Sequence, residues 1–459
     1  MLQNLSTADL QAIDAAHHLH PFTDNKGLGA EGARIIVRGE GVYLWDSEGN
    51  RILDGMAGLW CVNVGYGRNE IADAVSRQMR ELPYYNTFFK TTHPPAIELS
   101  ERLAEVTPEG FNRVFFTNSG SESVDTAFRM VRYYWIAKGR PEKHVVISRR
   151  NSYHGSTLAC SSLGGNTAMH AQDGGPIPGI RHIAQPYWFD EGGDMDKEEF
   201  GLAAARELEN AIEEIGEDKV AAFIAEPIQG AGGVVIPPDS YWPEIQRICD
   251  EHEILLVADE VICGFGRTGR WFGSDTFGIR PDLMTMAKGL SSGYQPIGGV
   301  MVSDGFAQTL IEEGGEFYHG FTYSGHPAAC AAAIANLDIL QREGIVEKVA
   351  SDTAPYLAEK WARIGEHPLV GEARIKGLVG ALELVPAKPD RRHFPDLGSA
   401  GTVCRDISFS NGLVMRAVRD AMVVSPPLVI SRAEIDEMAE LIWKTLDQTQ
   451  AALKDRGWM

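Results

Sequence analysis

The strongest constraint on the fold is a series of short apolar segments between residues 113 and 302, separated by segments with helical periodicity. Short, continuously apolar strands that alternate with helices are typical of a mostly parallel sheet covered on both faces. The pattern therefore predicts an α/β fold built around such a sheet. The expected strands are 114–116, 145–148, 220–225, 254–258, 283–286 and 299–302, and the expected helices include 200–215 and 239–252.

Both ends of the chain depart from this pattern. Residues 34–51 alternate between apolar and polar side chains around a Ser-Glu-Gly-Asn turn, which predicts a β-hairpin in a small, separate sheet. After an Ala-rich helix expected over residues 327–342, the pattern becomes mixed α and β. Ser431 and Glu434 form a capping box, so we expect a final helix that runs from there to residue 457.

The composition excludes several classes of protein. The 459 residues are 44% hydrophobic, enough for one large core or for two domains. The net charge of −21, without any run of Lys or Arg, argues against nucleic acid or an anionic membrane as a partner. The six cysteines lack CxxC spacing, as in reduced cytosolic proteins, and no apolar stretch reaches about 18 residues. We therefore expect a soluble, cytoplasmic protein.

A histidine cluster near the N-terminus raises the question of a metal. His17, His18 and His20 precede Pro21 and Phe22. Because neither an HExxH helix nor a nearby cysteine accompanies them, the pattern favours a packed N-terminal arm over a metal site. No metal framework is visible elsewhere, and we expect no metal.

Residues that could bind a ligand or take part in a reaction follow several of the expected strands. Ligands gather at the carboxyl ends of parallel strands, so these residues belong together. Gly120 and Ser121 lie where a strand meets a helix N-terminus, which suits a phosphate but is also an ordinary helix cap. Tyr153 offers a ring that either stacks on a flat ligand or packs. Asp259 ends an apolar run that would not hold a carboxylate without a cationic partner.

Lys288 follows the expected strand 283–286 and enters a turn rich in Gly and Ser. Partial desolvation there would lower its pKa and free the amine as an imine-forming nucleophile, although a lysine at a strand end can also extend to water. A phosphate cradle, a stacking ring, a carboxylate for a pyridinium and such a lysine are together what pyridoxal 5′-phosphate (PLP) requires. Their joint presence favours the imine-forming role.

A competing motif is the GxGxxG match in residues 264–269, which follows an expected strand. A dinucleotide fingerprint should open a helix and be followed by an acid about 20 residues on. The following segment is irregular, and residues 286–291 contain no acid. The context therefore argues against a dinucleotide site.

The segments ADEVICGFGRTG, with Asp259, and TMAKGLSSGYQPIGG, with Lys288, resemble the signature of class III, or ω-, aminotransferases of PLP fold type I. The likeness covers nearly the whole chain, and GLWCVNVGYG and YYNTFFKTTHP are similar to the (S)-selective amine:pyruvate branch. It implies a large domain with a mostly parallel seven-stranded sheet, and a small α+β domain built from both chain ends. The expected boundaries are 1–59, 60–335 and 336–459.

The resemblance also implies roles for individual residues. Lys288 and Asp259 would be the catalytic residues. The cofactor would be held by Gly120, Ser121, Tyr153, His154, Glu226, Asp259, Val261, Lys288 and, from a second subunit, Thr322. The substrate pocket would be lined by Leu59, Trp60, Phe88, Tyr153, Ala231, Ile262, Phe321 and Arg416.

Two of these residues decide substrate choice. Arg416 would bind the carboxylate of the keto acid, although from the residues alone it could equally be exposed or paired with Asp420. Ile262 stands where many family members have a glutamine that contacts the ring hydroxyl, so the pocket gains an apolar wall. That change favours hydrophobic amines over ω-amino acids.

The resemblance implies a PLP-dependent transaminase that moves an amino group from a primary amine or ω-amino compound to pyruvate or a related keto acid or aldehyde. The alternatives are an ω-amino acid, putrescine or taurine transaminase, a same-fold aminomutase or decarboxylase, and a non-catalytic PLP-binding module. The aromatic segment 83–89 and the segment GFTYSG predict a homodimer with shared active sites, with pairing into a tetramer left open.

Overall fold

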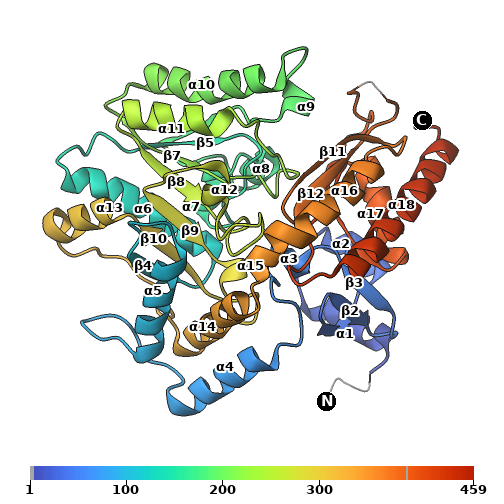
Figure 1. Cartoon of the computed structure of the whole chain (residues 1–459), viewed down its shortest axis with the longest axis horizontal. Coiled ribbons are helices and arrows are strands. Elements are labelled where there is room, and N and C mark those ends of the chain that lie inside the picture. The colour runs from blue at the N-terminus through green and yellow to red at the C-terminus, as the bar shows by residue number, and fades with distance from the viewer. Residues whose placement is uncertain (1–4, 389–390) are drawn as a thin grey trace.

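A seven-stranded sheet forms the centre of the computed structural model, which describes residues 5–388 and 391–459 (Figure 1). Its strand order is β4-β10-β9-β8-β7-β5-β6. All neighbours are parallel except β10, which runs antiparallel to both β4 and β9. The strands are β4 (Arg113–Thr117), β5 (Val145–Arg149), β6 (Ile180–Ile183), β7 (Val220–Ala225), β8 (Leu255–Asp259), β9 (Leu283–Met286) and β10 (Gly298–Val302).

Helices cover both faces of this sheet, as the apolar strands predict. Val146 packs in a cluster with α6 (Gly120–Ala137) and α7 (Leu158–Leu163), whereas Ile147 packs with α10 (Lys197–Ile215) and α11 (Tyr241–Glu251). Successive residues of a strand face opposite sides, so each strand contributes to both layers. The expected α/β fold is confirmed. Strand β6 was not predicted, because its sequence IRHI is short and half polar.

The remaining helices of this part surround the sheet. α14 packs against α4 and α5 at the lower edge in Figure 1. None of the helices in the described residues is long and apolar enough to cross a membrane. The elements are α4 (Asn69–Glu81), α5 (Pro94–Val106), α8 (Thr167–Asp173), α9 (Trp188–Glu191), α12 (Gly273–Phe277), η1 (Lys288–Leu290), α13 (Asp304–Thr309), η2 (Leu310–Gly314) and α14 (Pro327–Arg342).

Two small sheets are built from the ends of the chain, and the first contains strands of both ends. In the first, β1 (Ile36–Glu40), β2 (Tyr43–Asp46) and β3 (Arg51–Asp54) are extended by the C-terminal β13 (Leu413–Val414), which pairs in parallel with β3. In the second, the order is β11 (Val370–Lys376), β12 (Val379–Leu384), β15 (Ala421–Val424) and β14 (Arg416–Val418). The expected hairpin is β2–β3, and β1 adds a third strand to it.

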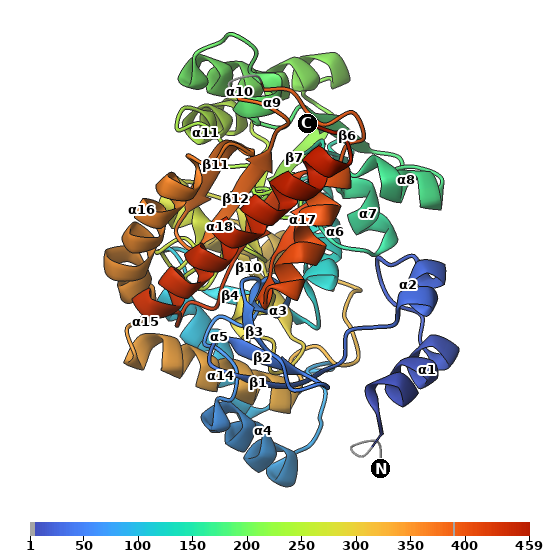
Figure 2. The same cartoon turned by 90° about the vertical axis from the view of Figure 1, so that its right-hand side faces the viewer.

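Helices of both chain ends lie around these sheets (Figure 2). The last helix ends at Asp455, two residues before the expected end. The expected boundaries after residues 59 and 335 fall inside helices α3 and α14. The helices are α1 (Thr7–His17), α2 (Asn25–Glu31), α3 (Ala57–Trp60), α15 (Ile345–Lys348), η3 (Val349–Thr353), α16 (Ala354–Ile364), α17 (Ser399–Ser410) and α18 (Arg432–Asp455).

Candidate active site

A cavity lies at the carboxyl ends of the parallel strands, where the sequence predicts a ligand site. Its walls come from the segments that follow β4, β5, β7, β8 and β9. All but one of the lining residues were expected; the exception is Gly155. The cavity is lined by Gly120, Ser121, Tyr153, His154, Gly155, Glu226, Asp259, Val261, Ile262 and Lys288.

Asp259, the last residue of β8, is held in place by three hydrogen bonds. His154 Nδ1 donates to Oδ2 at 2.7 Å, while the Val261 amide and the Thr285 hydroxyl donate to Oδ1 at 3.2 and 3.1 Å. The side chain is buried and faces the cavity. A fixed carboxylate in such surroundings favours a cation, such as a protonated ring nitrogen. The role of Thr285 in holding Asp259 was not predicted, because the two residues lie on different strands, β9 and β8.

Lys288 enters the cavity directly after β9. Its φ of 41° lies in the left-handed region, which non-glycine residues adopt chiefly where the surrounding structure imposes it. Burial lowers the pKa of its ammonium, and the positive charge of Arg416 lowers it further, against the opposing effect of Asp259 and Glu226. The predicted desolvation is therefore present, and it favours the neutral, nucleophilic amine.

The N-terminus of α6 forms another wall, with Gly120 and Ser121 in its first turn. A Cβ on Gly120 would lie 3.0 Å from the Val261 side chain, and one on Gly155, at φ 132°, would lie 2.5 Å from Ser121 Oγ. Glycine is therefore required at Gly155, and a side chain at Gly120 would be tightly packed against Val261. The free N–H groups and the dipole of this helix suit a phosphate.

Glu226, which follows β7, connects the cavity to the loop 229–235. Its carboxylate accepts hydrogen bonds from the amides of Tyr153 at 3.2 Å and Gly230 at 3.0 Å. Burial raises its pKa to about 7. The loop contains Ala231, which is partly exposed and does not line the cavity.

Arg416, the first residue of β14, approaches the same region from the small sheet. Its positive charge lowers the pKa of Lys288, and burial lowers the pKa of its own guanidinium. Asp420 is engaged elsewhere, since it accepts from the amides of Gly398 and Gly401. Within the described residues, Arg416 forms no side-chain hydrogen bond or ion pair.

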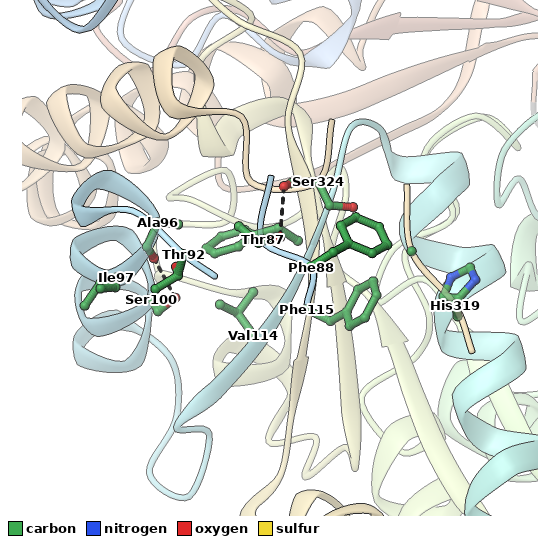
Figure 3. A pocket seen from close by; sticks show the side chains of 12 residues that line it. Thr87, Phe88, Thr92, Ala96, Ile97, Ser100, Val114, Phe115, His319 and Ser324 are labelled. Carbon is green, nitrogen blue, oxygen red and sulfur yellow. Dashed lines mark hydrogen bonds between the residues drawn. The ribbon is translucent and has the colours of Figure 1, made fainter. Parts of the chain in front are cut away.

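The other expected substrate residues lie outside this cavity in the single chain. Trp60 is buried in a hydrophobic cluster that also contains Ile262, whereas Leu59 is 60% exposed. Phe88 lines a second cavity between α5, β4 and the loop 319–324, where it lies beside Phe115 (Figure 3). Its neighbour Thr87 donates to Ser324 O at 3.4 Å.

Phe321 and Thr322 belong to the loop that borders this second cavity. The Phe321 ring packs edge-on against His319, with centroids 5.0 Å apart. Thr322 is exposed, and its carbonyl accepts a hydrogen bond from the Tyr84 hydroxyl at 2.7 Å. The single chain therefore groups Phe88, Phe321 and Thr322 with one another and not with Lys288.

The structure shows what the GxGxxG match in residues 264–269 forms instead of a dinucleotide site. Residues 264–269 form consecutive turns after β8, and no helix begins within them. A helix N-terminus is what would bind a pyrophosphate there. The residues of the cavity fit PLP instead, because a carboxylate, an aromatic ring, a helix N-terminus and a lysine of lowered pKa face one space. The fold and the site define a PLP-binding protein of fold type I.

Comparisons with known proteins agree with this class. The aminotransferase class-III family model matches residues 29–446. A putrescine–pyruvate aminotransferase from Pseudomonas aeruginosa is 61% identical over 98% of this chain and 99% of that protein. A diaminobutyrate–2-oxoglutarate transaminase from Halomonas elongata is 41% identical over 96% of this chain and 95% of that protein.

Solved structures agree as well. A thermostable (S)-enantioselective ω-transaminase from Thermomicrobium roseum is 46% identical and has a TM-score of 0.93, covering 97% of this chain and 99% of that chain. The chain belongs to the class III aminotransferases. It is therefore a PLP-dependent transaminase, as the resemblance implies, and the aminomutase, decarboxylase and non-catalytic alternatives are set aside.

Proposed function

We propose that the enzyme transfers the amino group of a primary amine, putrescine included, to pyruvate in two half-reactions that use one site. The observation that carries this proposal is the cavity in which Lys288, with a lowered pKa, and the fixed carboxylate of Asp259 face the N-terminus of α6. The donor and acceptor are supported by the putrescine–pyruvate aminotransferase that is 61% identical to this chain.

The cavity residues would hold PLP, which when bound supplies an electron sink for the bond broken at the substrate carbon. Asp259 would keep the ring nitrogen protonated, because its carboxylate favours a cation there. Tyr153 would stack on the ring, and the amides of Gly120 and Ser121 would bind the phosphate. Val261 and His154 would enclose the ring, and Glu226 would hold Tyr153 through its backbone amide.

Lys288 would act as the general base and acid. Its Nζ would accept a proton from the substrate carbon that carries the amine and donate it to the cofactor carbon. Burial that lowers the pKa of this amine keeps a larger share of it neutral, which a base requires. Lys288 and Asp259 are therefore the two residues that the reaction needs most.

Arg416 would distinguish the two substrates. A guanidinium forms two parallel hydrogen bonds with a carboxylate, which suits pyruvate. An amine donor without a carboxylate would instead contact the apolar wall that includes Ile262. Because Arg416 is partly exposed and has no ion-pair partner in the described chain, its side chain is free to turn away. Leu59, Trp60 and Ala231 would complete this pocket.

We also propose a homodimer in which Phe88, Phe321 and Thr322 of each subunit complete the site of the other. Thr322 is exposed, and in the same region Tyr85 and Phe89 are 50% and 90% exposed. Large exposed aromatic side chains mark surfaces that associate. The parallel pairing of β3 with β13 brings the two chain ends together. It supports the division of the chain into a small domain of residues 1–59 and 336–459 and a large domain of residues 60–335. All six cysteines are free thiols, in keeping with the cytoplasm.

The test is a spectrum of the purified protein during each half-reaction. We expect a visible absorption band that bleaches when putrescine is added and returns with pyruvate, but returns much more slowly with an equal concentration of 2-oxoglutarate. A band that putrescine does not bleach would contradict the proposed donor. Equal recovery with both keto acids would contradict the proposed acceptor.

A further inference from the structure

The N-terminal arm (residues 5–33) carries a cluster of metal-ligating side chains apart from the active site. Asp14 and His18 are one turn apart at the end of α1, and His20 follows. Asp14 Oδ1 lies 3.2 Å from His18 Nδ1, and Asp14 Oδ2 lies 2.8 Å from His20 Nε2. Within residues 5–388 and 391–459, no other group of three such residues brings its ligand atoms this close together.

We propose that Asp14, His18 and His20 bind one Zn²⁺ ion. Two imidazole nitrogens and a carboxylate oxygen are a ligand set that zinc accepts in tetrahedral sites with water in the fourth position. Bonds of about 2.0 to 2.2 Å place the ligand atoms of a tetrahedron about 3.3 to 3.5 Å apart. The separations of 3.2 and 2.8 Å involve the two different oxygens of Asp14, and one ligand atom from each of the three residues lies within 4.8 Å of the others, so rotations of the side chains would bring them to that spacing.

The backbone already holds the ligands in place. Residues four apart share one face of a helix, and the His18 amide donates to Asp14 O at 2.9 Å. The His20 amide donates to Asn25 Oδ1 at 2.9 Å, which fixes the turn after the helix. The two imidazole rings lie with centroids 4.1 Å apart. These contacts bring the three ligands near one another before the ion binds, which lowers the entropic cost of binding.

The three side chains are also accessible to solvent and can offer lone pairs to an ion. The exposed fractions are 19% for Asp14, 59% for His18 and 25% for His20, so an ion can enter from solvent. Without metal, each imidazole N–H donates a hydrogen bond to a carboxylate oxygen of Asp14. To bind Zn²⁺, each ring shifts that proton to its other nitrogen, and the lone pair replaces the hydrogen bond.

The position of the site links the ion to the active-site region. Phe22, two residues after His20, packs edge-on against Tyr153, with ring centroids 6.2 Å apart. Helix α1 has no buried residue and lies at the side of the molecule with α2 (Figure 2). An ion that joins α1 to residue 20 would therefore reduce the motion of the arm beside Tyr153.

The test is calorimetric titration of the full-length, PLP-loaded protein, without a histidine tag, with Zn²⁺ in phosphate-free buffer. We expect one ion per chain. Each of three variants should weaken zinc binding at least about tenfold: Asp14→Asn, His18→Ala and His20→Ala. Loss of a residue that only hydrogen-bonds to a metal ligand already lowers metal affinity about tenfold, so loss of a ligand should cost at least as much. His17→Ala is the matched control: it removes a neighbouring histidine that is not part of the cluster, and should leave the affinity unchanged.

Absence of saturable binding, or equal affinities in the wild type and the three ligand variants, would overturn the site. The effect on the arm has its own measurement, the hydrogen exchange of residues 14–24. Zn²⁺ should slow this exchange in the wild type and in His17→Ala, but not in His20→Ala. Unchanged exchange in wild-type protein with bound zinc would overturn the link between the ion and the arm.

Discussion

At the scale of single residues, the chemistry depends on charges that the fold leaves in unusual surroundings. Lys288 is a cation whose pKa burial lowers, Glu226 is an acid whose pKa burial raises to about 7, and Arg416 is partly buried with no ion-pair partner in the described chain. Perturbed groups that share one region are typical of functional sites. Two of them give quantitative predictions.

Arg416→Ala should lower kcat/KM for pyruvate about 100-fold or more, which corresponds to about 3 kcal/mol for a lost bidentate pair. The reason is that only the keto acid presents a carboxylate to the guanidinium. Steady-state kinetics with pyruvate and with an aldehyde acceptor that has no carboxylate would measure this. The aldehyde reaction should be largely retained, and equal losses with both acceptors would show that Arg416 is structural.

Glu226→Gln should flatten the pH dependence of stability. A carboxyl with a raised pKa in the folded state holds its proton longer there than in the unfolded chain, so stability falls as pH rises from about 4.5 to about 7. A shift of this size would make the wild type lose about 2 kcal/mol more than the variant between pH 5.5 and pH 8.

Urea unfolding of both proteins at the two pH values would measure this difference. Parallel stability curves would show that Glu226 does not titrate in that range. Glu260 is a useful comparison, because burial also raises its pKa to about 7 although it lies outside the cavity. Glu260→Gln should also flatten the pH dependence of stability. It should leave turnover unchanged, whereas Glu226→Gln should lower turnover because Glu226 lines the cavity.

At the scale of elements, the small sheet supports the loop 229–235 through one buried arginine. Arg374 of β11 donates to the carbonyls of Gly233 at 2.6 Å and Val234 at 2.9 Å, and pairs with Glu383 of β12 at 3.0 Å. Tyr187 contributes its hydroxyl to the same network. The network joins two strands of the small sheet to the loop that contains Ala231.

Arg374→Ala should destabilise the protein by about 3 to 5 kcal/mol, because it leaves a buried carboxylate and carbonyls without a partner. The double variant Arg374→Met with Glu383→Leu should cost less, since it removes both members of the buried pair and, among the charged groups, leaves only the partly exposed Glu372 without its arginine. Arg280→Ala is the control: its pair with Asp250 is exposed and worth under about 1 kcal/mol. Denaturant unfolding measures all three, and similar losses for Arg374→Ala and Arg280→Ala would contradict the supporting role.

At the scale of the whole molecule, the single chain leaves aromatic side chains in water near the second cavity. Phe89 is 90% exposed and Tyr85 is 50% exposed, both in the segment between α4 and α5. The proposed partner subunit would cover them. The active site of each subunit would then depend on assembly.

Phe89→Asp should therefore dissociate the dimer and reduce activity, while each chain stays folded because the substituted side chain is exposed. Light scattering with size-exclusion chromatography gives the mass, and circular dichroism the fold. Met195→Asp is the control: this residue is 45% exposed and precedes α10, at the opposite end of the molecule from α4 and α5 in Figure 1. An active monomer of Phe89→Asp would contradict shared sites.

The amino-acid sequence by itself determined six of the seven strands of the central sheet and the reactive residues that follow their ends. Strands β7 to β9 are buried along their whole length and mostly apolar, and Asp259 and Lys288 stand out as charges at the ends of such runs. These signals are local, so they are visible without a structure. The resemblance then supplied the roles of residues with weaker patterns, such as Val261 and Glu226.

The tertiary structure alone decided which distant residues meet. Thr285 supports Asp259 across neighbouring strands, and Gly155 is needed because Ser121 lies against it. Asp14 lies beside His18 and His20 because a helical turn and the following loop bring the three together, although His17, His18 and His20 alone predicted only a packed arm. The contacts of Thr285 and Gly155 depend on packing between segments, and packing leaves no periodic pattern in the sequence.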